Sequence, residues 1–278
     1  ETDDSNWVIN IRRISKYVSL FCVIGIIAGL VFPPLLGYSE TPEWTSAQVI
    51  LPEGINLPNT PQPDSLPSPD GETPSSVRGA WTTIFSDDFE GAFPGSWSVA
   101  DGQEGYGEYY WGQSTCRPYA GTNSAWAVGG GAQGSSLACG ANYPDNASSW
   151  MVYGPFSLED ASDAEFSFKF WLYSESDYDY FYAMASIDGS NVYGVKWSGN
   201  SGGWAEYVFD LTNVYTLGDL SGQPQVWIAF LFESDGSDNF AEGVYVDDLV
   251  LRKYIPDTYT ITASAGEYGG ISPSGAVE

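Results

Sequence analysis

Aromatic and polar side chains alternate over residues 165–170, which read Glu-Phe-Ser-Phe-Lys-Phe. Successive side chains of a β-strand point to opposite faces, so this period of two predicts a strand with one buried and one solvated face. Further strand-like runs, separated by Gly, Asp, Asn or Ser, cover residues 81–85, 124–128, 149–156, 164–173, 180–187, 192–197, 204–211, 225–232 and 243–251. This series, which contains no convincing helix, predicts an all-β, two-sheet sandwich over residues 80–254.

The composition agrees with an all-β surface protein. The chain has 11 Trp, 19 Tyr and 14 Phe, residue types that favour strands. Its 32 Gly and 17 Pro supply turns between strands.

The charge is strongly acidic, with 36 Asp and Glu against 9 Lys and Arg and a formal net charge of −27. Such a field repels nucleic acid and disfavours docking of the globular part on anionic lipid. Divalent cations or a partner with a basic face are the natural complements. The alternative is that the acids only keep a surface protein soluble.

The chain contains no histidine. This absence excludes Ser-His-Asp and Cys-His catalysis, zinc sites built on histidine and haem ligation by histidine. Hydrolysis by a pair of carboxylates remains possible.

Three cysteines are present. Cys22 lies in an apolar N-terminal run, where we expect it to be inert. Cys116 and Cys139 lie outside that run, and an extracytoplasmic compartment would allow them to form a disulfide. The alternative is a pair of buried free thiols.

The N-terminal residues predict a membrane anchor. Residues 1–16 end in a basic cluster with Arg12, Arg13 and Lys16, and residues 17–38 carry no charge. A membrane-spanning helix needs about 20 apolar residues, and no further Lys or Arg occurs until Arg78. The positive-inside rule therefore predicts a cytoplasmic stub over 1–16, a transmembrane signal anchor over 17–38, and an extracytoplasmic remainder. A cleavable signal peptide is the alternative.

Two further segments flank the predicted sandwich. Residues 39–79 are rich in proline and predict an extended linker that buries no core (Pro42, Pro52, Pro58, Pro61, Pro63, Pro67, Pro69 and Pro74). Residues 255–278 contain an alternating run at 258–264 followed by glycines, and predict the start of a C-terminal β repeat.

Short motifs at both ends of the sandwich carry a family resemblance. Residues 85–91 read Phe-Ser-Asp-Asp-Phe-Glu-Gly and residues 243–251 read Gly-Val-Tyr-Val-Asp-Asp-Leu-Val-Leu, with Trp-containing motifs at 111–112, 124–127, 149–151 and 202–204 between them. Residues 82–253 resemble the MAM-like, choice-of-anchor-type jelly-roll modules of bacterial surface proteins, including the module appended to immune-inhibitor-A-like proteases. The tail resembles the opening of an internalin-B-type β repeat.

The resemblance implies that the first and last strands meet and that their acids hold a structural cation. The positions that match are Asp88, Glu90 and Asp247 or Asp248, with Asp101 as a further candidate. Oxygen ligands alone suit Ca²⁺, or Na⁺, better than a transition metal. The alternative is a solvated rim of turn acids.

Two aromatic clusters could form a face on which sugar rings stack. The candidates for ligand binding are Tyr109, Tyr110, Trp111, Tyr178 and Tyr180. Aromatic rings combine an apolar face with a polar tip, which suits both glycans and protein interfaces. The alternative is that most of these rings pack the sandwich.

Acids in two turns offer a possible carboxylate pair for hydrolysis. Glu175, Asp177 and Asp179 lie in one turn, and Glu233, Asp235 and Asp238 in another. They alternate with Ser and Gly as turn residues do, and none is expected to be buried with a raised pKa. We therefore do not expect an enzyme.

Three functions remain open. The first is a membrane-anchored extracytoplasmic recognition or adhesion module that binds glycan or protein. The second is a single-pass accessory subunit of a larger membrane complex, in which the jelly roll caps the outer face and other subunits surround the anchor. The third and most remote is a carboxylate-based hydrolase.

Overall fold

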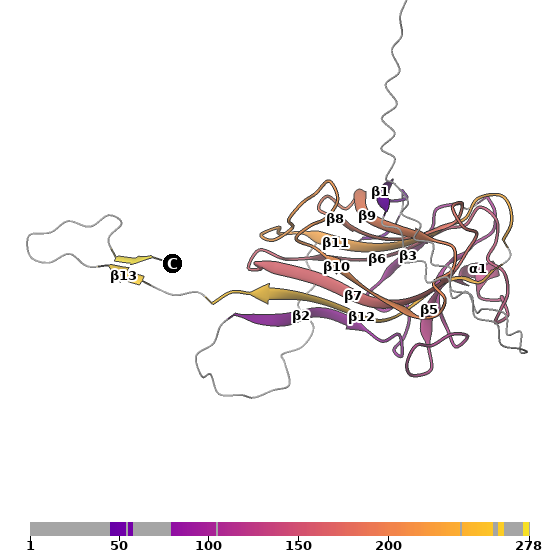
Figure 1. The fold of residues 1–278 in the computed structure, drawn as a ribbon, viewed down its shortest axis with the longest axis horizontal. Coiled ribbons are helices and arrows are strands. Elements are labelled where there is room, and N and C mark those ends of the chain that lie inside the picture. Colours follow the sequence, from indigo (N-terminus) through magenta and orange to yellow (C-terminus); the bar gives the residue numbers. More distant parts are fainter. Residues whose placement is uncertain are drawn as a thin grey trace, which may run out of the picture. The chain divides into compact units, whose positions relative to one another are not determined.

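The computed structural model describes residues 45–53, 55–57, 79–103, 105–239, 241–257, 261–263 and 275–277. Within these ranges the chain is almost entirely β-structure, arranged as two antiparallel sheets packed face to face (Figure 1). The predicted all-β sandwich is therefore confirmed.

Sheet A has six strands in the order β1-β9-β8-β11-β6-β3. Their bounds are β1 Thr45–Ile50, β3 Ser98–Asp101, β6 Ser148–Phe156, β8 Tyr180–Ser186, β9 Asn191–Ser198 and β11 Val226–Glu233. Sheet B has the order β10-β7-β12-β5-β4, and β2 also pairs with β12. Its bounds are β2 Ala80–Asp87, β4 Tyr110–Ser114, β5 Ser124–Gly130, β7 Asp163–Tyr173, β10 Ala205–Asp210 and β12 Gly243–Ile255. Among the described residues a single short helix, α1 Gly131–Gly134, follows β5.

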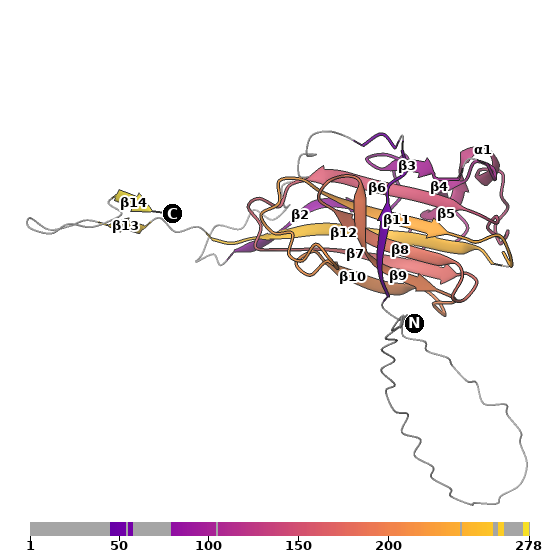
Figure 2. The same cartoon turned by 90° about the horizontal axis from the view of Figure 1, so that it is seen from above.

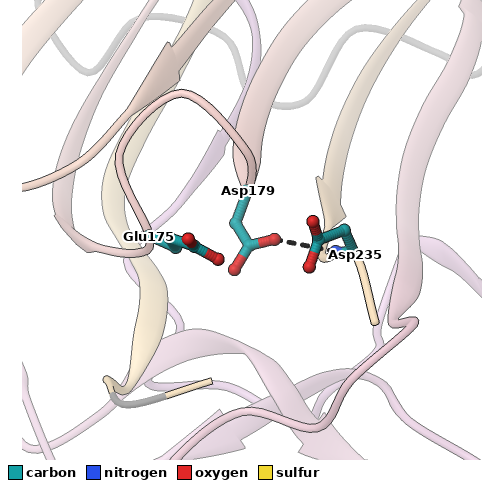
Figure 3. A group of neighbouring side chains, drawn as sticks. All are labelled: Glu175, Asp179 and Asp235. Carbon is teal, nitrogen blue, oxygen red and sulfur yellow. Dashed lines mark hydrogen bonds between the residues drawn. The ribbon is translucent and has the colours of Figure 1, made fainter. Parts of the chain in front are cut away.

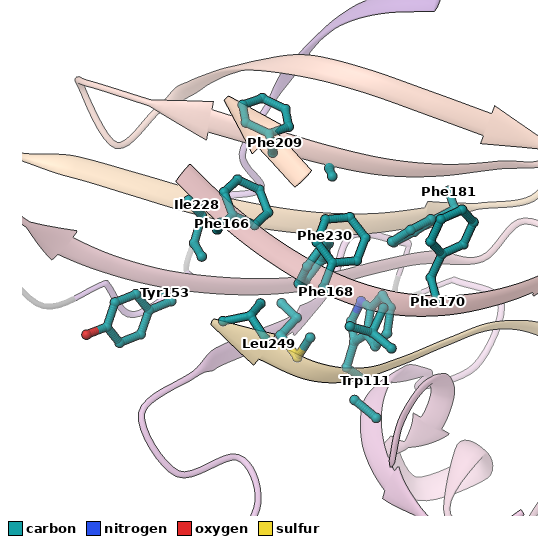
Figure 4. Close-up of a cluster of buried hydrophobic side chains, with 14 of the residues drawn as sticks. Trp111, Tyr153, Phe166, Phe168, Phe170, Phe181, Phe209, Ile228, Phe230 and Leu249 are labelled. Atoms are coloured by element: carbon teal, nitrogen blue, oxygen red, sulfur yellow. The ribbon is translucent and has the colours of Figure 1, made fainter. Parts of the chain in front are cut away.

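The main core lies between the two sheets and consists largely of aromatic rings (Figure 4). The alternation predicted for 165–170 is present in β7, where Phe166, Phe168 and Phe170 are buried. Phe168 meets Phe230 of sheet A edge-on at 4.8 Å between ring centroids. Each fully buried ring of this kind stabilises the fold by about 1.5–3 kcal/mol relative to an exposed one.

Two strands of sheet A do not alternate. Every residue of β6 is buried, and so is nearly every residue of β11. A continuous apolar run is the pattern of a strand covered on both faces. Sheet B covers one face of these strands, and a second apolar cluster covers the other, with Trp150, Tyr182, Met184, Trp227 and Leu231 among its buried members.

Part of the segment expected as a linker closes this second cluster. β1 pairs with β9 at one edge of sheet A. The following residues 51–53 and 55–57, here called the strap, place Leu51, Ile55 and Leu57 on the cluster. At the opposite edge, the Ser98 hydroxyl on β3 donates to the carbonyl of Asn56 at 2.8 Å. The four strand spacings from β9 to β3 amount to about 19 Å, which a chain of this length can cross (Figure 2).

The strands that carry the two end motifs, β2 and β12, meet as the resemblance implied. β12 pairs with β2 in antiparallel register, so that Leu249 lies opposite Asp87. The register of β12 against β7 shifts between Asp247 and Val250, and the intervening Asp248 has a positive φ of 46°.

The remaining predictions concern residues 255–278 and residues 17–38. Within the expected β repeat, β13 Ile261–Ala263 pairs with β14 Gly275–Val277 as a two-stranded sheet. The predicted anchor at 17–38 lies outside the described residues. Among the residues that are described, no helix is long and apolar enough to cross a bilayer.

Candidate functional site

A disulfide-bonded loop covers part of the outer face of sheet B. The loop joins β4 to β5 over residues 115–123, and Cys116 within it is bonded to Cys139. The predicted disulfide is thus confirmed. The bond links the start of the loop to the segment that follows α1, and so restricts the movement of the loop residues.

Two carboxylates hold the rest of the loop. Glu90 Oε1 accepts hydrogen bonds from the backbone N–H groups of Thr122 and Asn123, both at 2.7 Å. These bonds lower the pKa of Glu90. Asp247 is fully buried, and its Oδ2 accepts from the N–H of Tyr119 at 2.7 Å. Burial raises the pKa of Asp247, although its hydrogen bonds act in the opposite direction.

Glycine is required at one position of this loop. Gly121 has a φ of 61°, and a Cβ placed there would collide with the carboxylate of Glu90. The close approach of Glu90 to the loop backbone therefore depends on the missing side chain.

Two side chains of the loop, Arg117 and Tyr119, contact aromatic residues in or beside sheet B. The guanidinium of Arg117 lies 3.8 Å from the ring centroid of Trp171 on β7. It also donates through Nε and Nη2 to the carboxylate of Glu242, at 3.2 and 2.5 Å. Tyr119 meets Trp204, the residue before β10, edge-on at 5.6 Å.

These rings form one patch, here called the aromatic platform and defined as Tyr119, Trp171, Tyr173 and Trp204. Tyr119 is 46% exposed and Tyr173 is 38% exposed, and the two indoles are half-buried. Tyr173 lies 6.4 Å from Trp171 between centroids. Clustered exposed rings of this kind mark interaction surfaces more often than scattered ones do.

The cations of the platform are each paired with an acid. Lys169 lies 5.2 Å from the centroid of Tyr119 and forms an ion pair with Glu206 of β10 at 2.7 Å. Arg117 is paired with Glu242. The platform therefore presents no net positive charge within a strongly acidic chain.

None of the five aromatic residues predicted to bind a ligand belongs to this patch. Trp111 is fully buried in the core, and its indole N–H donates to the carbonyl of Ser149. Tyr109 and Tyr110 are half-buried, Tyr180 is half-buried with the Lys196 ammonium 3.5 Å from its ring centroid, and Tyr178 is exposed. Tyr119 and Trp204 were missed because their proximity depends on the path of the 115–123 loop.

The predicted cation ligands are not gathered into one group. Asp88 accepts from the N–H of Glu90, and Asp101 accepts from the N–H groups of Gln103 and Tyr109. Glu90 and Asp247 hold the 115–123 loop, as described above. The backbone thus already uses several of these carboxylates, and the calcium site stays a prediction.

A different set of acids does come together. Among the described residues, one group of three potential ligand side chains has oxygen atoms within 4.8 Å of one another, namely Glu175, Asp179 and Asp235 (Figure 3). Asp179 is 0% exposed. It accepts from the Tyr143 hydroxyl at 2.5 Å and from the N–H of Asp235 at 2.7 Å.

The expectation that no acid in these turns would be buried is wrong. Burial raises the pKa of Asp179, and burial together with repulsion from Asp238, Asp235 and Asp179 raises the pKa of Glu175. Asp179 nevertheless has both oxygens engaged and no access to solvent. It joins the turn after β7 to the turn after β11, which is a structural role.

Comparisons with known proteins find structural likeness only. The sequence matches no family model and no curated protein. Among solved structures, the K2 adhesin domain of Lys-gingipain is 16% identical with a TM-score of 0.40, covering 62% of this chain and 99% of that domain.

Two further structures compare similarly. The K3 adhesin domain of Lys-gingipain from Porphyromonas gingivalis W83 is 17% identical with a TM-score of 0.38, covering 61% of this chain and 98% of that one. A xylan-binding domain from CBM 22 is 15% identical with a TM-score of 0.37, covering 64% and 97%. Likeness at this level assigns no function, so any functional argument rests on the side chains described above.

Proposed function

We propose that the sandwich is a non-catalytic recognition module that binds neutral carbohydrate chains on the aromatic platform. One observation carries this proposal: two exposed rings, Tyr119 and Tyr173, and two half-buried indoles gather at a disulfide-bonded loop on one side of sheet B. The disulfide-bonded loop favours binding because a surface that is already ordered loses less conformational entropy when the ligand binds.

The chemistry of the patch favours sugars. Tyr and Trp rings offer an apolar face to the C–H groups of a sugar ring, while their polar tips meet its hydroxyls. The charged groups beside them, Arg117 with Glu242 and Lys169 with Glu206, offer both donors and acceptors. Their pairing leaves no free cation to attract an acidic glycan, so the proposed ligand is neutral.

Several features favour binding without catalysis. The chain has no histidine, and the buried acid Asp179 is engaged on both oxygens. The two carboxylates beside the aromatic platform, Glu242 and Glu206, are each held in an ion pair, with Arg117 and Lys169 respectively.

We also propose that the module is displayed outside a membrane, anchored by residues 17–38. The Cys116–Cys139 disulfide supports this location because such bonds persist in oxidising compartments. The resemblance of its end motifs to MAM-like jelly-roll modules fits the same proposal. Whether the chain also serves as an accessory subunit of a membrane complex stays a prediction.

The test is binding of the whole chain to an array of neutral and acidic glycans, followed by titration of the best neutral binders. Trp204→Ala and Tyr119→Ala are each expected to weaken binding more than tenfold. Trp81→Ala is the matched control, because Trp81 is also an exposed ring on sheet B but lies near Tyr254. Absence of neutral glycan binding, or an equal effect of all three substitutions, would refute the proposal.

A further inference from the structure

A hollow of about 380 Å³ lies between the open edges of the two sheets. β1 and β9 of sheet A form one side, and β10, the edge strand of sheet B, forms the other. The lining residues are Ser46, Gly194, Val195, Tyr207, Val208, Phe209, Asp210, Asn213 and Tyr215. This volume falls at the small end of the range for small-molecule sites, about 300–1,000 Å³. We refer to this hollow as the edge pocket.

The lining of the edge pocket combines rings with short polar groups. Tyr215 is 51% exposed, so its ring is available to a ligand. Ser46, Asp210 and Asn213 contribute a hydroxyl, a carboxylate and an amide. The carboxylate of Asp210 is held by two hydrogen bonds from Thr212, through its N–H at 2.8 Å and its hydroxyl at 2.7 Å. A few oriented polar groups among apolar surfaces are what fixes a small polar ligand in place.

β10 leads from the aromatic platform to the edge pocket. Trp204 and Glu206 belong to the platform side, since Trp204 meets Tyr119 and Glu206 pairs with Lys169. Val208 and Asp210 follow on the same face of the strand and line the pocket, together with Tyr207 and Phe209 of its other face. Alternate residues of a strand lie about 7 Å apart, so the path from residue 204 to 210 is about 20 Å long. A ligand spanning it must be several sugar rings long.

We propose that the chain binds an extended neutral oligosaccharide that lies along β10, with one part on the aromatic platform and one end in the edge pocket. This inference rests on the proposed function and adds to it the length and direction of the ligand. An extended peptide that pairs with the open edge of β10 is the competing occupant. The exposed acids Glu206 and Asp210 and the open Tyr215 ring favour the sugar, whose hydroxyls can donate to both carboxylates.

The test is calorimetric titration of the whole chain with cello-, xylo- and β-1,4-galacto-oligosaccharides of one to six units. Affinity for the preferred series is expected to rise with chain length until the ligand covers both surfaces. Tyr215→Ala and Asn213→Ala are each expected to lower the affinity for the longest oligosaccharide at least tenfold. Neither substitution should change the affinity for the shortest oligosaccharide that binds. Tyr106→Ala is the control, because Tyr106 is an exposed ring outside both surfaces.

The outcomes separate this inference from the proposed function. If Trp204→Ala abolishes binding but Tyr215→Ala leaves the length dependence unchanged, the platform binds sugar and the inference is overturned. If no oligosaccharide binds, both fail. A third outcome is that the chain binds unstructured peptides and no sugar, and that Val208→Pro abolishes the peptide binding. This result would show that a peptide strand pairs with the edge of β10, since proline disrupts an edge strand that accepts a partner.

Discussion

The guanidinium of Arg117 lies over the indole of Trp171, with 3.8 Å between its central carbon and the ring centroid. The same group pairs with Glu242, whose side chain is only 14% exposed. Glu242 also accepts a hydrogen bond from the hydroxyl of the buried Tyr245 at 3.0 Å. One cation therefore links the 115–123 loop to β7 and to the start of β12.

Arg117→Met is expected to destabilise the fold by about 1–2 kcal/mol, because it removes the cation over the ring and leaves Glu242 without its counter-ion. The double variant Arg117→Met with Glu242→Gln should lose less than the single variant, since no unpaired charge remains. Chemical unfolding of the four combinations measures the coupling. Arg252→Met is the control, because Arg252 has an equivalent pair with Glu165 and lies over Trp81 at 4.5 Å, but is more exposed. Equal losses in both positions would contradict the special role of Arg117.

Removal of the disulfide is expected to affect both stability and binding. The bond closes a loop with a sequence separation of 23, for which chain entropy accounts for about 3 kcal/mol. Cys116→Ser with Cys139→Ser should therefore lower the free energy of unfolding by about that amount. Because Tyr119 follows Cys116 on the same loop, glycan affinity should fall further than global unfolding explains. Titration at a temperature where the variant remains folded separates the two effects, and unchanged affinity there would show that Glu90 and Asp247 suffice to hold the loop.

The strap should behave as part of the folded domain. Leu51 is 7% exposed on the second cluster, whereas its neighbour Ile50 is 69% exposed. Leu51→Asp is expected to cost about 3 kcal/mol, because it removes buried apolar surface and places a charge there. Ile50→Asp is the matched control and should change stability by less than about 0.5 kcal/mol. Similar, small effects of both substitutions in urea unfolding would mean that the strap does not hold the cluster in solution.

Much of this fold follows from local pattern. The alternation of β7 identified a strand with one buried face, and Gly and Asp turns separated most of the other strands. The short strands β3 and β4 were missed because they contain glycine or small polar residues and show no clear period of two. The Cys116–Cys139 bond could be predicted because only two cysteines lie outside the apolar N-terminal run.

The strap and the aromatic platform could not be predicted from local sequence patterns. The apolar runs of β6 and β11 did carry a signal, since strands buried on both faces need a cover on each side. Nothing local identifies residues 51–53 and 55–57 as that cover, because only three apolar side chains stand among polar and turn residues. Tyr119 and Trp204 likewise lie far apart in the chain, and their contact depends on a loop held by Glu90 and Asp247.

The cluster of Glu175, Asp179 and Asp235 is expected to make the fold less stable as the pH rises. The pKa of Glu175 is raised above its usual value of 4.5 by burial and by repulsion from Asp238, Asp235 and Asp179. Ionisation therefore destabilises the folded state above the folded-state pKa, and this penalty disappears below the unfolded-state value. Glu175→Gln should raise the melting temperature at pH 8, and its advantage should shrink towards zero near pH 4.

An acid with the opposite shift supplies the control. Burial opposes ionisation of Asp188, but hydrogen bonds from Asn191, Ser190 and Ser186 outweigh it and hold the pKa of Asp188 at about 2. Its contribution to stability is present above the unfolded-state value of 3.8 and is lost as the pH falls through 2. Asp188→Asn should therefore lower the melting temperature at pH 8, where Glu175→Gln raises it. If both substitutions shift the melting temperature in the same direction at pH 8, repulsion within the Glu175, Asp179 and Asp235 cluster does not limit the stability of this fold.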